Sequence, residues 1–112
     1  MTKSVLQQIV DLLDRHSASY DVLRHEPVYT SAEAAAVRGT TLSSGAKALI
    51  CKCDSQMVMF VMPADRRLAS KLVRRELGWR KIRFANRHEV LYITCLTPGF
   101  IPPFGSLFGF QT

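Results

Sequence analysis

The fold of this chain rests on the stretch Ala46-Lys-Ala-Leu-Ile-Cys-Lys-Cys53, Asp54-Ser-Gln56, Met57-Val-Met-Phe-Val-Met62. The first part alternates weakly between apolar and polar residues, which is typical of a strand. The last part is apolar at every position, as in a strand that is buried on both faces. The polar tripeptide between the two parts favours a tight turn. The stretch therefore predicts a β-hairpin at the centre of the domain.

On the N-terminal side of this hairpin, the pattern predicts two helices and a short strand. Apolar residues repeat at helical spacing over 5–13, with Ser4 as the start signal. Tyr20–His25 is a candidate strand that Pro27 stops. Thr30-x-x-Glu33 is a capping box that begins an alanine-rich helix, and Gly39 ends that helix.

On the C-terminal side, helices and strands alternate. Asp65 is a candidate N-cap for a helix that carries its basic residues outward and ends at Gly78. Residues 79–85 read as a strand, residues 88–92 as a short helix, and residues 107–112 as the beginning of another strand. With 112 residues and no internal repeat, the chain is predicted to be one mixed α/β (α+β) domain over residues 1–112.

Composition narrows the functional classes. Hydrophobic residues make up 47% of the chain, too many for a disordered segment. No apolar run reaches membrane-spanning length, and we expect neither a signal nor a transit peptide. The three cysteines are an odd number without zinc-ligand spacing, so we interpret Cys51, Cys53 and Cys95 as reduced thiols, with metal or redox chemistry as the alternative. A cytoplasmic location and no metal site follow as predictions.

The net charge of +6 is unevenly distributed. Nine of the fifteen basic residues lie between Arg66 and Arg87, with Glu76 as the only acidic residue among them. Such clustering favours a phosphate-rich partner through counterion release. The alternative is an ordinary solvated helix face, since no DNA-reading motif accompanies the cluster.

Lys47 is the first candidate site residue. In a strand it shares one face with Leu49, Cys51 and Cys53, where an ammonium group is costly unless it is paired or reaches water. Two interpretations are open: the side chain extends to solvent at the strand end, or it forms an anion site for a phosphate or carboxylate.

The second candidate is Thr97-Pro-Gly-Phe-Ile-Pro-Pro-Phe-Gly105, with three prolines and two glycines in nine residues. Proline fixes φ and glycine permits positive φ and close approach, so this loop is expected to hold one shape and to offer main-chain N–H groups. No catalytic triad, carboxylate pair or nucleotide-binding loop is present. His25 is either structural or catalytic. An enzyme built on this sequence would work through positioning and backbone dipoles.

Taken in order, several segments resemble the YbaK/ProRS-associated editing domain family. They are His25-Glu-Pro27, Thr30-x-x-Glu33-Ala-Ala, Gly45-Ala-Lys47-Ala-Leu, Val61-Met-Pro-Ala-Asp65, Glu76-Leu-Gly78 and the loop from Thr94 to Gly105. The resemblance covers residues from about 5 to 110. It implies a mostly antiparallel, barrel-like sheet with surrounding helices, incomplete at the C-terminus of this chain.

The resemblance also implies a function: trans-editing hydrolysis of a mischarged aminoacyl ester on tRNA, with tRNA-Pro as the expected substrate, in the cytoplasm and without a cofactor. Catalytic positions would be Lys47 and Gly99. Substrate-binding positions would be His25, Thr30, Phe100, Ile101, Pro102 and Pro103. As a hypothesis, tRNA is held by Lys71, Arg74, Arg75, Lys81 and Arg83.

This chain departs from the family pattern at two points. The family usually has glycine where Cys95 stands, so a Cβ there is expected to narrow the pocket or shift the loop. The family also continues past the strand expected near Leu107, so a homodimer that completes the sheet is a candidate partner, along with tRNA but neither DNA nor a membrane. The alternative functions are a non-catalytic RNA-binding or synthetase-associated module, and a structural remnant that persists as an oligomer.

Overall fold

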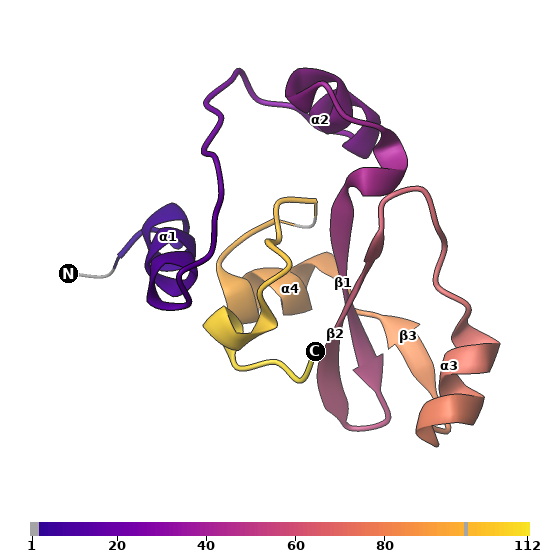
Figure 1. Cartoon of the computed structure of the whole chain (residues 1–112). Coiled ribbons are helices and arrows are strands. Elements are labelled where there is room, and N and C mark those ends of the chain that lie inside the picture. The colour runs from indigo at the N-terminus through magenta and orange to yellow at the C-terminus, as the bar shows by residue number, and fades with distance from the viewer. Residues whose placement is uncertain (1–2, 98) are drawn as a thin grey trace.

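The computed structural model describes residues 3–97 and 99–112, so Pro98 of the predicted loop lies outside the described residues. In these ranges, β1 (Ala46–Cys53), β2 (Gln56–Pro63) and β3 (Ile82–Phe84) form an antiparallel sheet in the order β2-β1-β3 (Figure 1). The helices are α1 (Val5–Arg15), α2 (Ser31–Arg38), α3 (Ser70–Leu77) and α4 (Arg87–Thr94), with 3-10 turns η1 (Leu42–Ser44) and η2 (Gly105–Phe108). The mixed α+β class is confirmed.

The predicted hairpin is confirmed. Its register runs from Cys53 opposite Gln56 to Ala46 opposite Pro63. Asp54 turns the chain with a positive φ of 53°, a conformation that aspartate tolerates better than most residues. Its carboxylate also accepts the backbone N–H of Lys81 at 2.9 Å. The turn is thereby tied to the segment that leads into β3.

β3 covers only one part of β1. It pairs Ile82–Phe84 with Cys51–Cys53, and the N–H of Ala85 adds one bond to the carbonyl oxygen of Ile50 at 2.9 Å. Along this edge, no described strand pairs with residues 46–49. We call residues 50–53 the closed end of β1 and residues 46–49 its open end.

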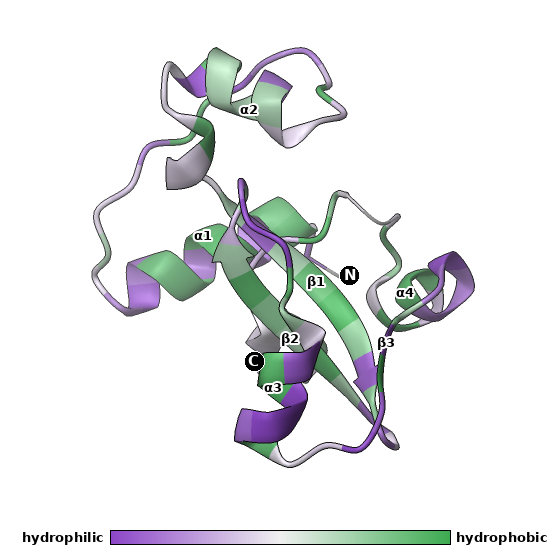
Figure 2. Ribbon diagram, turned by 90° about the vertical axis from the view of Figure 1, so that its right-hand side faces the viewer, coloured by the Kyte–Doolittle hydropathy of each residue, from purple (hydrophilic) through white to green (hydrophobic). Residues whose placement is uncertain are grey.

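The core lies on both faces of the closed end. On one face, Cys51, Cys53 and Val58 are buried under Leu68 and Trp79, on the side of α3. Burial raises the pKa of the Cys51 thiol to about 11, so this thiol stays protonated and unreactive. On the other face, three buried residues from β1, β2 and α4 form a second cluster, to which the C-terminal segment adds two aromatic rings: Ile50, Met59 and Val90, with Phe108 and Phe110. Figure 2 shows the hydrophobic hairpin against the hydrophilic surface of α3.

Local signals place the helices well. Ser4 and Thr30 each cap a helix by accepting the backbone N–H of the residue three positions later, both at 3.1 Å. Gly39 and Gly78 end α2 and α3 with positive φ, as predicted. The predicted start at Asp65 is wrong, because residues 64–69 first carry the chain around the sheet edge and α3 begins only at Ser70. None of the described helices combines the length and the apolar character needed to cross a bilayer.

Three strand predictions are corrected. Tyr20–His25 forms no strand, because no described strand lies beside it to supply a ladder, and Val22 and Leu23 stay exposed. Residues 107–112 begin in η2 and contribute a single parallel bridge, from Gln111 to Val58. β3 is shorter than residues 79–85 because Asp54 holds the backbone before it.

The prediction that β2 is buried on both faces is confirmed only in part. Val61, at the end of the hairpin that faces the open end of β1, is 42% exposed. The described strands make an open sheet, so closure into a barrel stays a prediction.

Candidate functional site

A pocket of about 320 Å³ lies at the open end of β1. It exists because β3 stops short and leaves space beside residues 46–49. Three segments distant in the sequence form its walls: the start of α2, the first half of β1 and the proline-rich loop. The lining residues are Val28, Tyr29, Thr30, Ser31, Ala34, Ala46, Lys47, Ala48, Leu49, Gly99 and Ile101.

Lys47 supplies the positive charge of this pocket. Its side chain is half-buried, and the ammonium group donates a hydrogen bond to the carbonyl oxygen of Arg66. That contact uses one of the three ammonium donors and anchors the group at the strand end. The two remaining N–H donors of the ammonium group suit an anionic or carbonyl oxygen. The two interpretations of Lys47, a side chain that extends to the strand end and an anion site, are therefore compatible.

The N-terminus of α2 forms the wall that faces Lys47. Thr30 is the N-cap, and its hydroxyl is bonded to both the backbone N–H and the carboxylate of Glu33 at 3.1 Å. The cap fixes the start of the helix and places Thr30 and Ser31 at the pocket. Ala34, one turn later, adds a small apolar surface.

The loop after α4 forms the third wall. Thr94 is buried and holds the beginning of the loop, because its hydroxyl donates to Val90 at 2.7 Å and accepts from the N–H of Leu96 at 3.1 Å. Gly99 has φ of 94°, a conformation that side chains disfavour. The N–H of Phe100 is used inside the loop, by the carbonyl of Thr97 at 3.1 Å.

The structure brings together four of the predicted residues, Lys47, Thr30, Gly99 and Ile101. Four others stand outside the pocket lining: His25, Phe100, Pro102 and Pro103. Exposed His25 instead donates from Nδ1 to the carbonyl oxygen of Glu26 at 2.7 Å.

Tyr29 is a pocket residue that sequence reasoning missed. Its ring meets that of Phe100 edge-to-face, with centroids 6.3 Å apart. Its position next to the capping threonine was the only available signal.

Cys95 affects the backbone rather than the pocket. It ends α4 in the left-handed conformation with φ of 60°, its side chain is exposed, and it is absent from the pocket lining. Cys95 therefore does not narrow the pocket by lining it, and the alternative expectation, a shift of the loop, stays a prediction. The effect of Cys95 is a conformational cost, because a residue with a Cβ is disfavoured in the left-handed conformation.

A second hollow, of about 420 Å³, lies at the other end of the hairpin. Its lining is basic except for one carboxylate and one apolar side chain: Lys52, Asp54, Arg74, Lys81, Ile82 and Arg83. Lys47 and Lys52 stand five positions apart on β1, which corresponds to roughly 17 Å. Of the other predicted tRNA contacts, Lys71 and Arg75 line a separate shallow hollow on α3.

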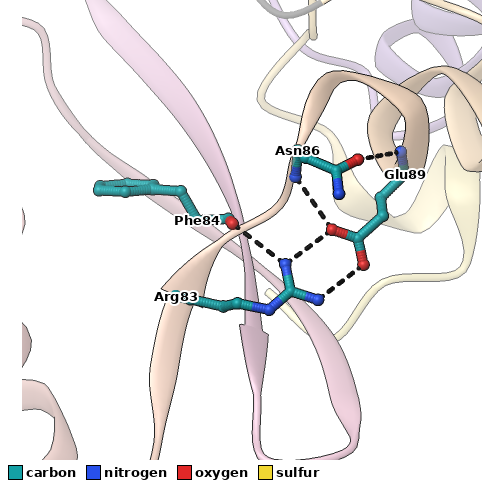
Figure 3. A network of polar contacts seen from close by, with 4 residues as sticks. All are labelled: Arg83, Phe84, Asn86 and Glu89. Atoms are coloured by element: carbon teal, nitrogen blue, oxygen red, sulfur yellow. Dashed lines mark hydrogen bonds and ion pairs between the residues drawn. The ribbon is translucent and has the colours of Figure 1, made fainter.

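Arg83 is held by an acidic partner. Its guanidinium donates two bonds to the Glu89 carboxylate, at 2.7 and 2.9 Å, and Glu89 also caps α4 by accepting the N–H of Asn86 at 3.0 Å (Figure 3). These bonds lower the pKa of Glu89 to about 2 and raise the pKa of Arg83. The pair joins β3 to α4 and gives Arg83 a structural contact, while its predicted contact with tRNA stays a prediction.

Comparisons with known proteins agree on one family. The family model described as the aminoacyl-tRNA editing domain matches residues 25–112. The multifunctional Ser/Thr-tRNA deacylase ProXp-y of Escherichia coli K12 is 32% identical over 102 residues, covering 88% of this chain and 61% of that protein. The prolyl-tRNA editing protein ProX of Acetoanaerobium sticklandii is 26% identical over 109 residues, and the aligned part covers 96% of this chain and 66% of that protein.

Solved structures agree on the fold. The hypothetical protein APE2540 has a TM-score of 0.76 at 26% identity, covering 86% of this chain and 65% of that one. A putative trans-editing enzyme for prolyl tRNA synthetase has a TM-score of 0.74 at 21% identity, covering 92% and 66%. This chain thus spans a little under two thirds of the length of the relatives that it matches.

Proposed function

Since this chain belongs to the aminoacyl-tRNA editing domain family, we propose that it hydrolyses the ester of a mischarged aminoacyl-tRNA in trans. One observation carries the proposal: Lys47 and Gly99 of the proline-rich loop line the same pocket, although they lie far apart in the sequence. A cation and a backbone turn across a small cavity are suited to the phosphate and the ester of one ligand.

In this mechanism the protein positions the substrate and stabilises charge. Lys47 contacts the 3′-terminal phosphate, and in the loop segment 99–102 the two residues that line the pocket, Gly99 and Ile101, bring their main-chain groups to the ester carbonyl. Water, or a neighbouring ribose hydroxyl, attacks the carbonyl carbon. When water attacks, the bond from the acyl carbon to the ribose oxygen breaks, the ribose oxygen takes up the proton that the water gives up, and the free amino acid leaves. When the ribose hydroxyl attacks, the acyl group moves to that hydroxyl, and water must still hydrolyse the new ester to release the amino acid. Negative charge on the carbonyl oxygen is stabilised by the preorganised backbone dipoles of the loop.

The acyl group is proposed to be small. Three alanines, Ala34, Ala46 and Ala48, line the pocket, whose 320 Å³ lies near the lower limit for ligand sites. The two curated relatives are named for Ser/Thr-tRNA deacylation and for prolyl-tRNA editing. Mischarged tRNA-Pro and Ser- or Thr-charged tRNA are therefore the substrates to test first.

The proposed tRNA contacts lie mainly on the basic hollow. Arg74 and Lys81 line it together with Lys52, at the far end of β1 from Lys47. Lys71 and Arg75 extend the positive surface along α3, whereas Arg83 contributes less because Glu89 occupies its guanidinium. Binding through these groups is electrostatic, so the affinity for uncharged tRNA is expected to fall as salt rises.

The decisive experiment is deacylation of mischarged tRNA by Lys47→Ala, with Lys3→Ala as the matched control. Lys3 lies before α1, pairs with Asp11 and is absent from both hollows. A hydrogen bond from a charged group is worth enough that kcat/KM should fall about 10- to 100-fold for Lys47→Ala and stay unchanged for Lys3→Ala. Equal activity of wild type and Lys47→Ala would exclude the proposed role.

The basic hollow favours a second candidate, a non-catalytic RNA-binding module. It predicts salt-dependent binding of uncharged tRNA with no release of amino acid from any charged tRNA.

We also propose how the chain assembles. Two copies form a homodimer in the cytoplasm, joined along the open sheet, so that the sheet closes towards a barrel. Sizing in solution tests it, and a monomer at all concentrations would contradict it.

A further inference from the structure

Two exposed aromatic rings stand at the mouth of the pocket, and neither has a role in the mechanism above. We propose that Tyr29 and Phe100 form a stacking platform for the nucleobase of the terminal nucleotide, an inference that rests on the proposed function. In this proposal the two rings hold the base, whereas Lys47 binds the phosphate.

The first support is exposure. Tyr29 is 76% exposed and Phe100 is 52% exposed, so neither ring belongs to the core. Tyr29 also lines the pocket that contains Lys47, so it lies within reach of a ligand bound there. An apolar ring that stays in water at a pocket mouth offers its area to a ligand.

The second support is the geometry of the pair. The rings meet edge-to-face, at 88° between their planes, so the contact occupies a face of only one ring. Tyr29 precedes the cap of α2, whereas Phe100 lies in the loop after α4. The pairing therefore holds both rings in place before any ligand binds, which lowers the entropy cost of stacking.

The third support is size. The pocket of 320 Å³ lies near the lower limit for ligand sites, and the proposed function already places the aminoacyl ester and the phosphate in it. The base must then lie outside the cavity, next to its rim. Every base has a π-face, and stacking on an aromatic ring is the usual way in which proteins hold an unpaired base.

The test uses two substrates and a matched control. The substrates are 3′-O-aminoacyl adenosine 5′-monophosphate and the corresponding aminoacyl ester of ribose 5-phosphate, which lacks the base. Tyr29→Ala should raise KM for the first about 5- to 100-fold and leave KM for the second unchanged. Tyr29→Phe, which keeps the ring, should behave as wild type. Tyr92→Ala is the control, since Tyr92 is 89% exposed on α4, away from the pocket.

The inference is overturned if Tyr29→Ala weakens both substrates equally, because Tyr29 would then act on the pocket and not on the base. Direct binding separates this failure from failure of the proposed function. A protein without esterase activity that binds AMP more tightly than ribose 5-phosphate, with the difference erased by Tyr29→Ala, supports the platform and contradicts the hydrolase. Equal binding of the two ligands by the wild type would contradict the platform, whatever the esterase result.

Discussion

The two ends of β1 differ in a way that locates function. At the closed end, Cys51 and Cys53 are fully buried, with β2 and β3 on either side and side-chain clusters on both faces. At the open end, β2 is the only one of the described strands that pairs with β1, and the space left by β3 becomes the pocket of Lys47. The difference teaches that this small domain concentrates its packing in one half of a hairpin and leaves a pocket beside the other half, where we propose that the substrate binds.

The sharpest test of this comparison places one substitution at each end of β2. Met59, opposite Ile50, is 1% exposed, whereas Met62, opposite Lys47, is half-buried. Met59→Ala leaves a cavity in the core and should lower the free energy of unfolding by about 2–5 kcal/mol. Met62→Ala should cost no more than about 1 kcal/mol. Denaturant unfolding of both variants measures the difference, and equal losses would show that the two ends are packed alike.

A smaller effect is expected at Cys95, where the chain leaves α4 for the loop beside the open end. Glycine adopts the observed φ of 60° without the steric cost that a Cβ imposes. Cys95→Gly should therefore raise the free energy of unfolding by about 1 kcal/mol. Cys95→Ser keeps the Cβ and should be neutral, which separates the backbone from the thiol. Stabilisation by both variants would assign the effect to the thiol instead.

The smallest effect is expected in the pH dependence of the free energy of unfolding, and it arises from the contact between Arg83 in β3 and Glu89 in α4. The pKa of Glu89 is lowered from 4.5 to about 2 in the fold, so its pair with Arg83 stabilises the protein fully above pH 4.5 and is lost as pH falls through about 2. Glu89→Gln keeps a side chain suited to the capping box and removes the charge. The gap in unfolding free energy between wild type and Glu89→Gln should be constant at neutral pH and shrink between pH 4.5 and 2. A gap that persists at pH 2 would rule out the ion pair as its source.

The site illustrates why prediction succeeded for some residues and failed for others. Lys47 was singled out by its own segment, as a charge on an apolar strand face, whereas Thr30 was named as a site residue through the family resemblance and only its helix cap followed from its neighbours. Tyr29 gave no such signal, because it lies beside Phe100 only in the folded chain, and the ion pair of Arg83 with Glu89 is likewise visible only in the structure. The roles of the predicted site residues in binding and catalysis stay predictions until the variants above are assayed.

The sequence by itself determined the hairpin, the helix caps, the glycines that end helices and the clustering of positive charge, because each depends on neighbours within a few positions. Only the tertiary structure decided that β3 stops after three residues, that Tyr20–His25 finds no partner strand, and that the pocket opens beside Lys47. Strand pairing joins residues far apart in the chain, and its extent depends on which backbone groups are still free once the loops are placed.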